Sequence, residues 1–216
     1  MNRTLILLTL IALLFATGMA KAQTLSSKVQ STYEACMGLQ AAIGTGSTAE
    51  LKAANKLLKE CDPKNFNSLR LLDDDQPSLN EHFVFDYEFV DSLIENRAVF
   101  HYAQRYAERA SERGLSSTPS EVFTKTCMVR GKSSTKFSYT SRGHQELAFV
   151  TEPGGAITIR VHDKTHDAWY NDTKMVKKGQ PSRTLVFDLP ADKRSSLEVE
   201  VINTSKKDIS FVVIKN

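Results

Sequence analysis

The chain has 216 residues, of which 41% are hydrophobic and 25% are charged, so it is long enough for one large domain or two small ones with a buried core. Its 28 basic and 25 acidic residues give a formal net charge of +3, without the clustered basic footprint of a nucleic-acid-binding protein. Composition therefore argues against nucleic acid as a partner.

Residues 1–22 have the pattern of a cleavable secretory signal. Arg3 provides the positive charge that precedes an apolar run, Leu5–Ala16. Ala20 and Ala22 are small residues at the two positions that a signal peptidase recognises. The apolar run is shorter than the roughly 20 residues needed to cross a bilayer. The mature chain is therefore expected to contain no transmembrane segment and to be exported, either to the periplasm or out of the cell.

Residues 23–115 are expected to form a helical segment. Apolar residues recur at spacings of three and four within Leu25–Ile43 and again within Leu51–Cys61, which predicts two amphipathic helices. Two glycines and a capping box, Ser47–Glu50, separate these helices. A short separation of this kind predicts an antiparallel helix pair.

A connection and a third, longer helix are predicted next. Lys64–Ser78 contains a run of aspartates and a proline, which favours a connection. A wide apolar stripe then extends over Val90–Ala110 and predicts one long helix. Such a stripe requires a partner surface, which is the helix pair, the strand half, or both.

The three cysteines, Cys36, Cys61 and Cys127, allow one disulfide in an oxidising compartment. Cys36 and Cys61 are the natural pair, because both belong to the helix pair. A disulfide requires Cα atoms within roughly 7 Å, whereas the unequal distances of the two residues from the turn imply an offset of ~10 Å along the helices. Free thiols therefore remain the alternative, and Cys127 is expected to be a buried thiol in a strand.

The hydrophobic period changes to two in residues 120–216. Seven or eight short runs alternate apolar and polar residues, as in Ile157–Val161 and Leu197–Val201, with turn signals such as Pro153–Gly155 between them. This pattern predicts an antiparallel β-sandwich of jelly-roll or Greek-key type. The whole chain is therefore expected to be an α+β protein, with a helical segment followed by a β-sandwich domain.

The strand half resembles the bacterial pre-peptidase C-terminal domains, which are β-sandwich modules that accompany secreted enzymes. The residues that carry the resemblance are Gly131, Phe137–Tyr139, Glu146–Phe149, Ile157–Val161, Leu185–Pro190, and the closing hairpin of Leu197–Asn203 and Ile209–Ile214. The sequence departs from the family where an acidic, aromatic strand is common, because it has Val161–Asp163 and a long polar loop there. The resemblance implies a non-catalytic accessory or binding role outside the cell.

The loop from His162 to Asp172 is the sharpest local feature, with two histidines and three aspartates. Calcium would be held there by aspartate and carbonyl oxygens, with Asp163, Asp167 and Asp172 as ligands. Zinc would use His162 and His166 with a carboxylate. A solvated loop without metal is the alternative, because histidines four residues apart have no fixed geometry outside a helix.

Trp169 and Tyr170 lie in the same polar loop. Exposed aromatic rings stack on sugars or anchor protein partners, and Trp and Tyr dominate interface hot spots. The alternative is that one ring closes the end of the sandwich core while the other covers a sheet edge, since large aromatic side chains are mostly buried.

These features together predict a secreted, non-catalytic binding or accessory protein that recognises a protein or a glycan through its sandwich loops, with calcium as the one possible cofactor. The chain has no nucleophile elbow, no His-Glu-x-x-His motif and no nucleotide fingerprint. Two alternatives remain, which are a metal-dependent hydrolase that uses residues 162–172 and a structural surface or assembly protein. The sequence leaves the oligomeric state open.

Overall fold

The computed structural model describes residues 24–66, 68–72, 85, 87–95, 122–171, 173, 175 and 178–216. The helices are α2 (Ser27–Thr45), α3 (Thr48–Cys61) and α4 (Tyr87–Glu95). The strands are β1 (Lys64–Asn65), β2 (Arg70–Leu71), β3 (Phe123–Val129), β4 (Ser133–Ser141), β5 (His144–Thr151), β6 (Thr158–Asp163), β7 (Ala168–Trp169), β8 (Ser182–Asp188), β9 (Ser195–Asn203) and β10 (Ile209–Lys215). No helix among these residues has the length and apolar character that a membrane crossing requires. The predicted signal, residues 1–22, lies outside the described residues.

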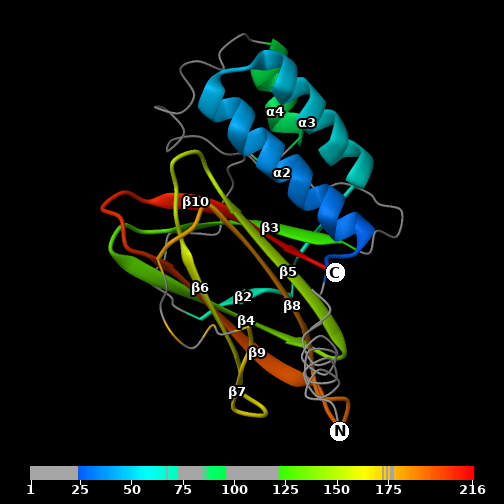
Figure 1. The fold of residues 1–216 in the computed structure, drawn as a ribbon, viewed down its shortest axis with the longest axis vertical. Coiled ribbons are helices and arrows are strands. Elements are labelled where there is room, and N and C mark those ends of the chain that lie inside the picture. The colour runs from blue at the N-terminus through cyan, green and yellow to red at the C-terminus, as the bar shows by residue number, and fades with distance from the viewer. Residues whose placement is uncertain are drawn as a thin grey trace, which may run out of the picture.

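The strands form two sheets of five strands each. The first sheet has the order β1-β3-β10-β5-β8, and the second has the order β2-β4-β9-β6-β7. All neighbours are antiparallel except β1 and β3. Apart from the two-residue strands β1 and β2, the order 3-10-5-8 facing 4-9-6-7 is that of an eight-stranded jelly roll (Figure 1). The predicted α+β class, with helices before antiparallel strands, is confirmed.

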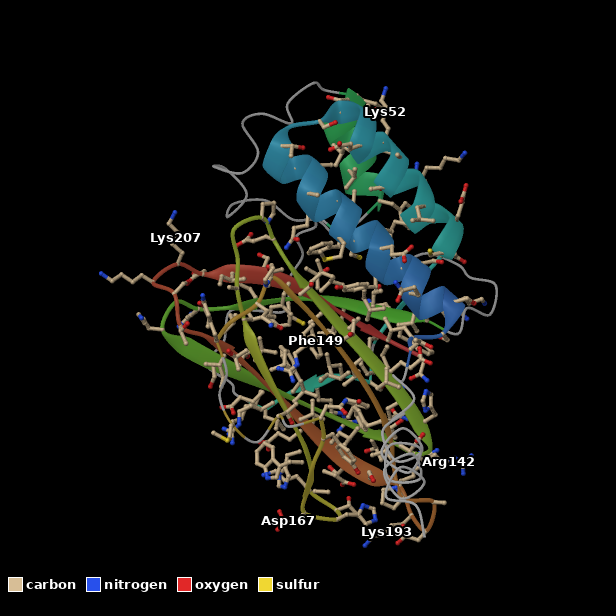
Figure 2. The ribbon with its side chains drawn as sticks, viewed as in Figure 1. Lys52, Arg142, Phe149, Asp167, Lys193 and Lys207 are labelled. Carbon is tan, nitrogen blue, oxygen red and sulfur yellow. The ribbon has the colours of Figure 1, made fainter. Side chains whose placement is uncertain are left out.

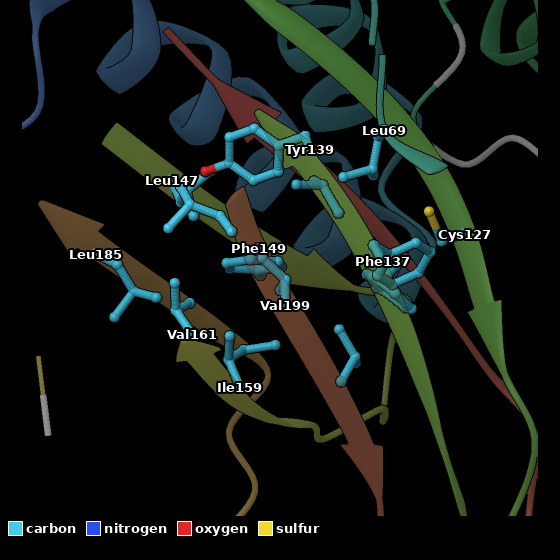
Figure 3. Packing of buried hydrophobic residues seen from close by; sticks show 14 of the residues in the cluster. Leu69, Cys127, Phe137, Tyr139, Leu147, Phe149, Ile159, Val161, Leu185 and Val199 are labelled. Atoms are coloured by element: carbon cyan, nitrogen blue, oxygen red, sulfur yellow. The ribbon is translucent and has the colours of Figure 1, made fainter. Parts of the chain in front are cut away.

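The two sheets share one core because their inward residues alternate with outward ones. In β9, for example, the alternate residues from Ser195 to Asn203 are buried. Phe137 of the second sheet meets Phe211 of the first edge to face, with ring centroids 6.1 Å apart. Figure 3 shows this core, in which Cys127 is buried as expected.

The helices cover the outer face of the first sheet. A second apolar cluster joins α2, α3 and α4 to outward residues of β5 and β10, including Ala148 and Val212. Glu146 of β5 accepts hydrogen bonds from the Ser26 amide at 2.8 Å and from the Ser26 hydroxyl at 2.7 Å, next to the start of α2. All three helices lie on the side of the first sheet that faces away from the second (Figure 1).

The connection predicted over Lys64–Ser78 is partly wrong. It contains β1, which pairs with β3, and β2, which pairs with β4, so this stretch adds a strand to each sheet. Phe66 and Leu69 between these strands are buried in the core between the sheets. Residues 73–84, with the aspartate run, and residues 96–121, with most of the predicted third helix, lie outside the described residues.

The predicted α2–α3 pair is present, with all three cysteines as free thiols. Gly46 ends α2 with a φ of 72°, and the Ser47 hydroxyl caps α3 by accepting a hydrogen bond from the Glu50 amide at 3.3 Å. The Cys36–Cys61 disulfide is not formed. Cys61 ends α3 beside the hydroxyl of Thr32, which lies one helical turn from Cys36. The two thiols therefore lie at different levels of the helix pair.

Candidate functional site

The polar stretch that begins at His162 is a hairpin on the edge of the second sheet. β6 continues to Asp163, the chain turns through Lys164–Asp167, and β7 returns so that Trp169 lies opposite His162. Asp167 adopts a left-handed conformation in this turn, with a φ of 52°, which aspartate tolerates better than most residues. Figure 2 shows Asp167 at the tip of the hairpin, pointing away from the molecule.

Trp169 is held against the outer face of β6. Its ring stacks on His162, with centroids 4.4 Å apart and planes inclined by 16°. The Arg160 guanidinium carbon lies 4.6 Å from the centroid of the same ring. Both contacts come from β6, and β7 is the last strand of the sheet. The indole is therefore fixed from the side of β6 and remains half-buried.

A row of charged side chains extends from this ring across the outer face of the second sheet, over β6, β9 and β4. Arg160 donates to Glu200 at 2.9 Å, and His162 Nε2 donates to Asp167 at 2.9 Å. Lys136 and Lys164 lie 3.7 and 3.4 Å from the carboxylate of Glu198. The Trp169 surface consists of Trp169, His162, Arg160, Glu198, Glu200, Lys136 and Lys164. It presents one aromatic ring beside alternating charges.

Tyr170 points to the other side of the hairpin. Its ring stacks on Phe187 of β8, with centroids 4.3 Å apart and planes inclined by 17°, and it packs on the core between the sheets. The next side chain, Asn171, donates to the Val186 carbonyl at 3.1 Å, on the edge of β8. Tyr170 thus closes the end of the core, as the alternative expected of one of the two rings, whereas Trp169 stays half-buried at the edge of the second sheet. Tyr170 does not belong to the Trp169 surface.

Asp163 forms the centre of a separate, buried polar network. Its fully buried carboxylate accepts hydrogen bonds from the Thr165 amide at 2.8 Å and from His166 Nδ1 at 2.6 Å. Burial alone raises the pKa of Asp163, but hydrogen bonds from Ser195, His166 and the Thr165 amide outweigh burial and lower it. The other imidazole nitrogen, Nε2, lies 3.3 Å from Asp192. The network joins the β6–β7 turn to the start of β9.

The predicted cluster of two histidines and two aspartates is therefore divided. His162 pairs with Asp167 on the outer face, whereas His166 pairs with Asp163 in the interior. The described residues contain no group of three or more His, Cys, Asp or Glu side chains arranged to hold a metal ion. Asp172, the third predicted calcium ligand, lies outside the described residues. The two aspartates that are described do not form the expected calcium site together.

The buried network does not have the geometry of a catalytic triad. Ser195 Oγ lies 3.2 Å from His166 Nδ1, which is the same nitrogen that contacts Asp163. A triad places the nucleophile and the carboxylate on different imidazole nitrogens. Ser195 is also fully buried, out of reach of a substrate. This arrangement orders the hairpin and provides no nucleophile.

Sequence reasoning missed Ser195 and Asp192, which lie about 30 residues from His166 in a different turn. No local signal connects them to the histidine. Arg160 was also missed, although its position two residues before His162 places both on one face of a strand.

No protein-family model matches the chain, and no curated protein matches it. Among solved structures, it is similar to the plu4264 protein of Photorhabdus luminescens, with 27% identity over 44% of this chain and 61% of that one and a TM-score of 0.24. It is also similar to tailspike protein 4 of bacteriophage CBA120, with 14% identity over 43% of this chain and 17% of that one and a TM-score of 0.25. The chain spans less than two thirds of the length of each. At such TM-scores no function is transferred, and the resemblance to pre-peptidase C-terminal domains stays a prediction.

Proposed function

We propose that the chain is an exported, non-catalytic binding or accessory protein that recognises a glycan through the Trp169 surface. The observation that supports this proposal is the fixed position of Trp169 at the sheet edge, against His162 and Arg160. A ring that is already held in place loses little conformational entropy when it stacks on the apolar face of a sugar. Export is supported by the signal pattern of residues 1–22.

The surroundings of the ring favour a glycan over a protein partner. Protein interfaces have an apolar core in which charged residues are depleted, whereas the neighbours of Trp169 in the Trp169 surface are charged side chains and one histidine. Carboxylate and ammonium groups are able to hydrogen-bond to sugar hydroxyls. The only large hydrophobic side chains exposed among the described residues are Leu72 and Met175, neither of which belongs to the Trp169 surface.

Trp169 is the only tryptophan of the chain, so its fluorescence reports directly on this surface. We expect a saturable fluorescence change with at least one member of a panel of cello-, chito-, xylo- and manno-hexaoses. Calorimetry with that sugar should show that Trp169→Ala weakens binding by at least about 30-fold, the equivalent of a hot-spot residue worth about 2 kcal/mol.

Tyr170→Phe is the matched control, because it changes the neighbouring aromatic residue, which faces the core, and should leave the affinity unchanged. Circular dichroism melting curves of both variants establish that they are folded. A flat response to the whole panel, or unchanged affinity in Trp169→Ala, would overturn the glycan proposal.

The alternatives receive less support. A metal-dependent hydrolase needs His162, Asp163, His166 and Asp167 in one site, and these residues form two separate pairs. A structural or assembly protein would use the apolar stripe of Val90–Ala110 to oligomerise, and most of this stripe lies outside the described residues.

A further inference from the structure

The outer face of the second sheet continues past the Trp169 surface to the opposite edge of the sheet. The sheet has the order β2-β4-β9-β6-β7, so Trp169 lies on one edge strand and β2 is the other. β2 is a two-residue strand that precedes the jelly roll, and its residue Arg70 pairs with Ser138 of β4. The extra strand therefore widens the face that carries Trp169.

Strand register aligns one residue from each of the five strands on this face. Residues directly opposite each other in antiparallel strands lie on the same side of the sheet. The paired residues form one continuous line, which we call the cross-strand row: Arg70, Ser138, Glu198, His162 and Trp169. Neighbouring strands are about 4.8 Å apart, so the row is about 19 Å long, perpendicular to the strands.

Arg70 and Leu72 mark the edge of this face that is furthest from Trp169. Leu69 is buried between the sheets, so its neighbour Arg70 faces outward, where it is exposed. Leu72 extends the ladder by donating its amide to the Lys136 carbonyl at 2.9 Å, and it is 47% exposed. This edge thus presents a guanidinium beside an exposed apolar side chain.

Polar groups occupy the surface between the two edges. The Glu198 carboxylate lies 3.7 Å from the Lys136 ammonium and 3.4 Å from that of Lys164. A carboxylate has about four acceptor positions, so these two ammonium groups leave others for the hydroxyls of a ligand. Ser138, the next residue of the row, adds a hydroxyl that both donates and accepts. The middle of the row therefore offers hydrogen bonds of both kinds.

We propose that the cross-strand row binds an extended linear glycan of about four sugars that lies across the strands, from Trp169 at one edge to Arg70 and Leu72 at the other. This inference rests on the proposed glycan binding and adds the length and direction of the ligand. One pyranose ring extends about as far as one strand spacing of ~4.8 Å, so about four linked sugars cover the row. The apolar side chains at both edges suit the apolar faces of sugar rings, and the polar groups between them suit the hydroxyls.

Chain length tests this proposal on the unchanged protein. The probe is the responding hexaose of the cello-, chito-, xylo- and manno-panel, and calorimetry compares it with the disaccharide of the same series. We expect the disaccharide to bind at least about tenfold more weakly, because it contacts one edge only and loses the hydrogen bonds that the charged donor Arg70 makes.

Arg70→Ala tests the second edge. It should weaken binding of the hexaose by about tenfold and leave binding of the disaccharide unchanged, whereas Trp169→Ala should weaken both. Leu72→Ser is a second variant at the same edge, for which the same pattern is expected if Arg70→Ala does not fold. Arg142→Ala is the matched control, because Arg142 is an exposed arginine in the turn after β4, outside the row (Figure 2).

The outcomes separate this proposal from glycan binding itself. Equal affinities for the hexaose and the disaccharide, with Trp169→Ala still weakening both, would overturn the cross-strand row and leave a short site at Trp169. A loss of hexaose affinity in Arg142→Ala as large as that in Arg70→Ala would also overturn it, because the effect would then come from net charge. A flat response to every hexaose would overturn both proposals.

Discussion

Replacing Asp163 by alanine should cause a large loss of stability, because its carboxylate is the acceptor on which the β6–β7 hairpin depends. The group is fully buried and accepts hydrogen bonds from the Thr165 amide and from His166. Alanine would remove both acceptors and leave these donors unsatisfied inside the protein. The loss therefore includes the desolvation of the partners as well as the lost bonds.

The expected magnitude follows from this burial. Each buried donor that loses its acceptor costs about 1–3 kcal/mol, so the two donors together cost about 2–6 kcal/mol. For a domain of this size each kcal/mol lowers Tm by about 2–4 °C. The Tm of Asp163→Ala should therefore be about 4–24 °C below that of the wild type.

Asp167→Ala in the same turn is the matched control. The Asp167 side chain is 93% exposed, although it also pairs with a histidine, His162, at 2.9 Å. Exposed pairs contribute about 0–1 kcal/mol, so Tm should fall by no more than about 4 °C. Differential scanning calorimetry of both variants at pH 7 measures the difference. Equal losses of stability in the two variants would refute the assignment of Asp163 as the acceptor that holds the hairpin.

Three further predictions concern titration, an unsatisfied hydroxyl and thiol reactivity. The folded pKa of Asp163 is lower than its ordinary value of 3.8, so its contribution to stability is complete above 3.8 and is lost as pH falls through the folded pKa. Tm should therefore fall less steeply on acidification in Asp163→Asn than in the wild type. Parallel curves of Tm against pH for the two proteins would contradict this. Tyr139→Phe should raise the free energy of unfolding by about 1 kcal/mol or more, because it removes a buried hydroxyl that has no hydrogen-bond partner among the described residues; a lower value in urea unfolding would show that the hydroxyl is bonded. Iodoacetamide should label Cys61 before Cys36 and Cys127, because burial raises the pKa of the two fully buried thiols furthest; mass spectrometry that finds Cys36 labelled first, or a disulfide between Cys36 and Cys61, would contradict the arrangement of free thiols.

Most of the fold follows from hydrophobic period, which is a local property. The period of 3.6 residues in α2 and α3, with the Ser47 cap between them, predicts the helix pair. The period of two predicts the main strands. β1 and β2 escape this reasoning because each has two residues, too few to establish a period. They form because Phe66 and Leu69 fit into the core between the sheets, which is a tertiary cause.

The candidate site was predicted in composition but not in arrangement. The residues of the β6–β7 hairpin were identified, yet their partners depend on register and on distant turns. Ser195 hydrogen-bonds to both Asp163 and His166. It lies about 30 residues away in the sequence, so no local pattern indicates this contact. The sequence therefore predicted a metal site from histidines and aspartates that are close in the chain. In the structure these residues lie on two different faces of the hairpin and form two separate pairs.

Strand alternation decides the roles of the two aromatic residues and of Lys215. Adjacent residues of an extended chain point to opposite faces, so Trp169 and Tyr170 do not share one contact surface, whatever their individual preferences. The same rule places Lys215 with Phe211 and Val213 on the inward side of β10, although composition alone assigns a lysine to solvent. Charge and aromaticity indicate what a side chain is able to bind. The position of the residue in the alternation of its strand determines which face of the sheet the side chain lies on. Trp169 is directed to the outer face of the second sheet and Lys215 to the end of the core.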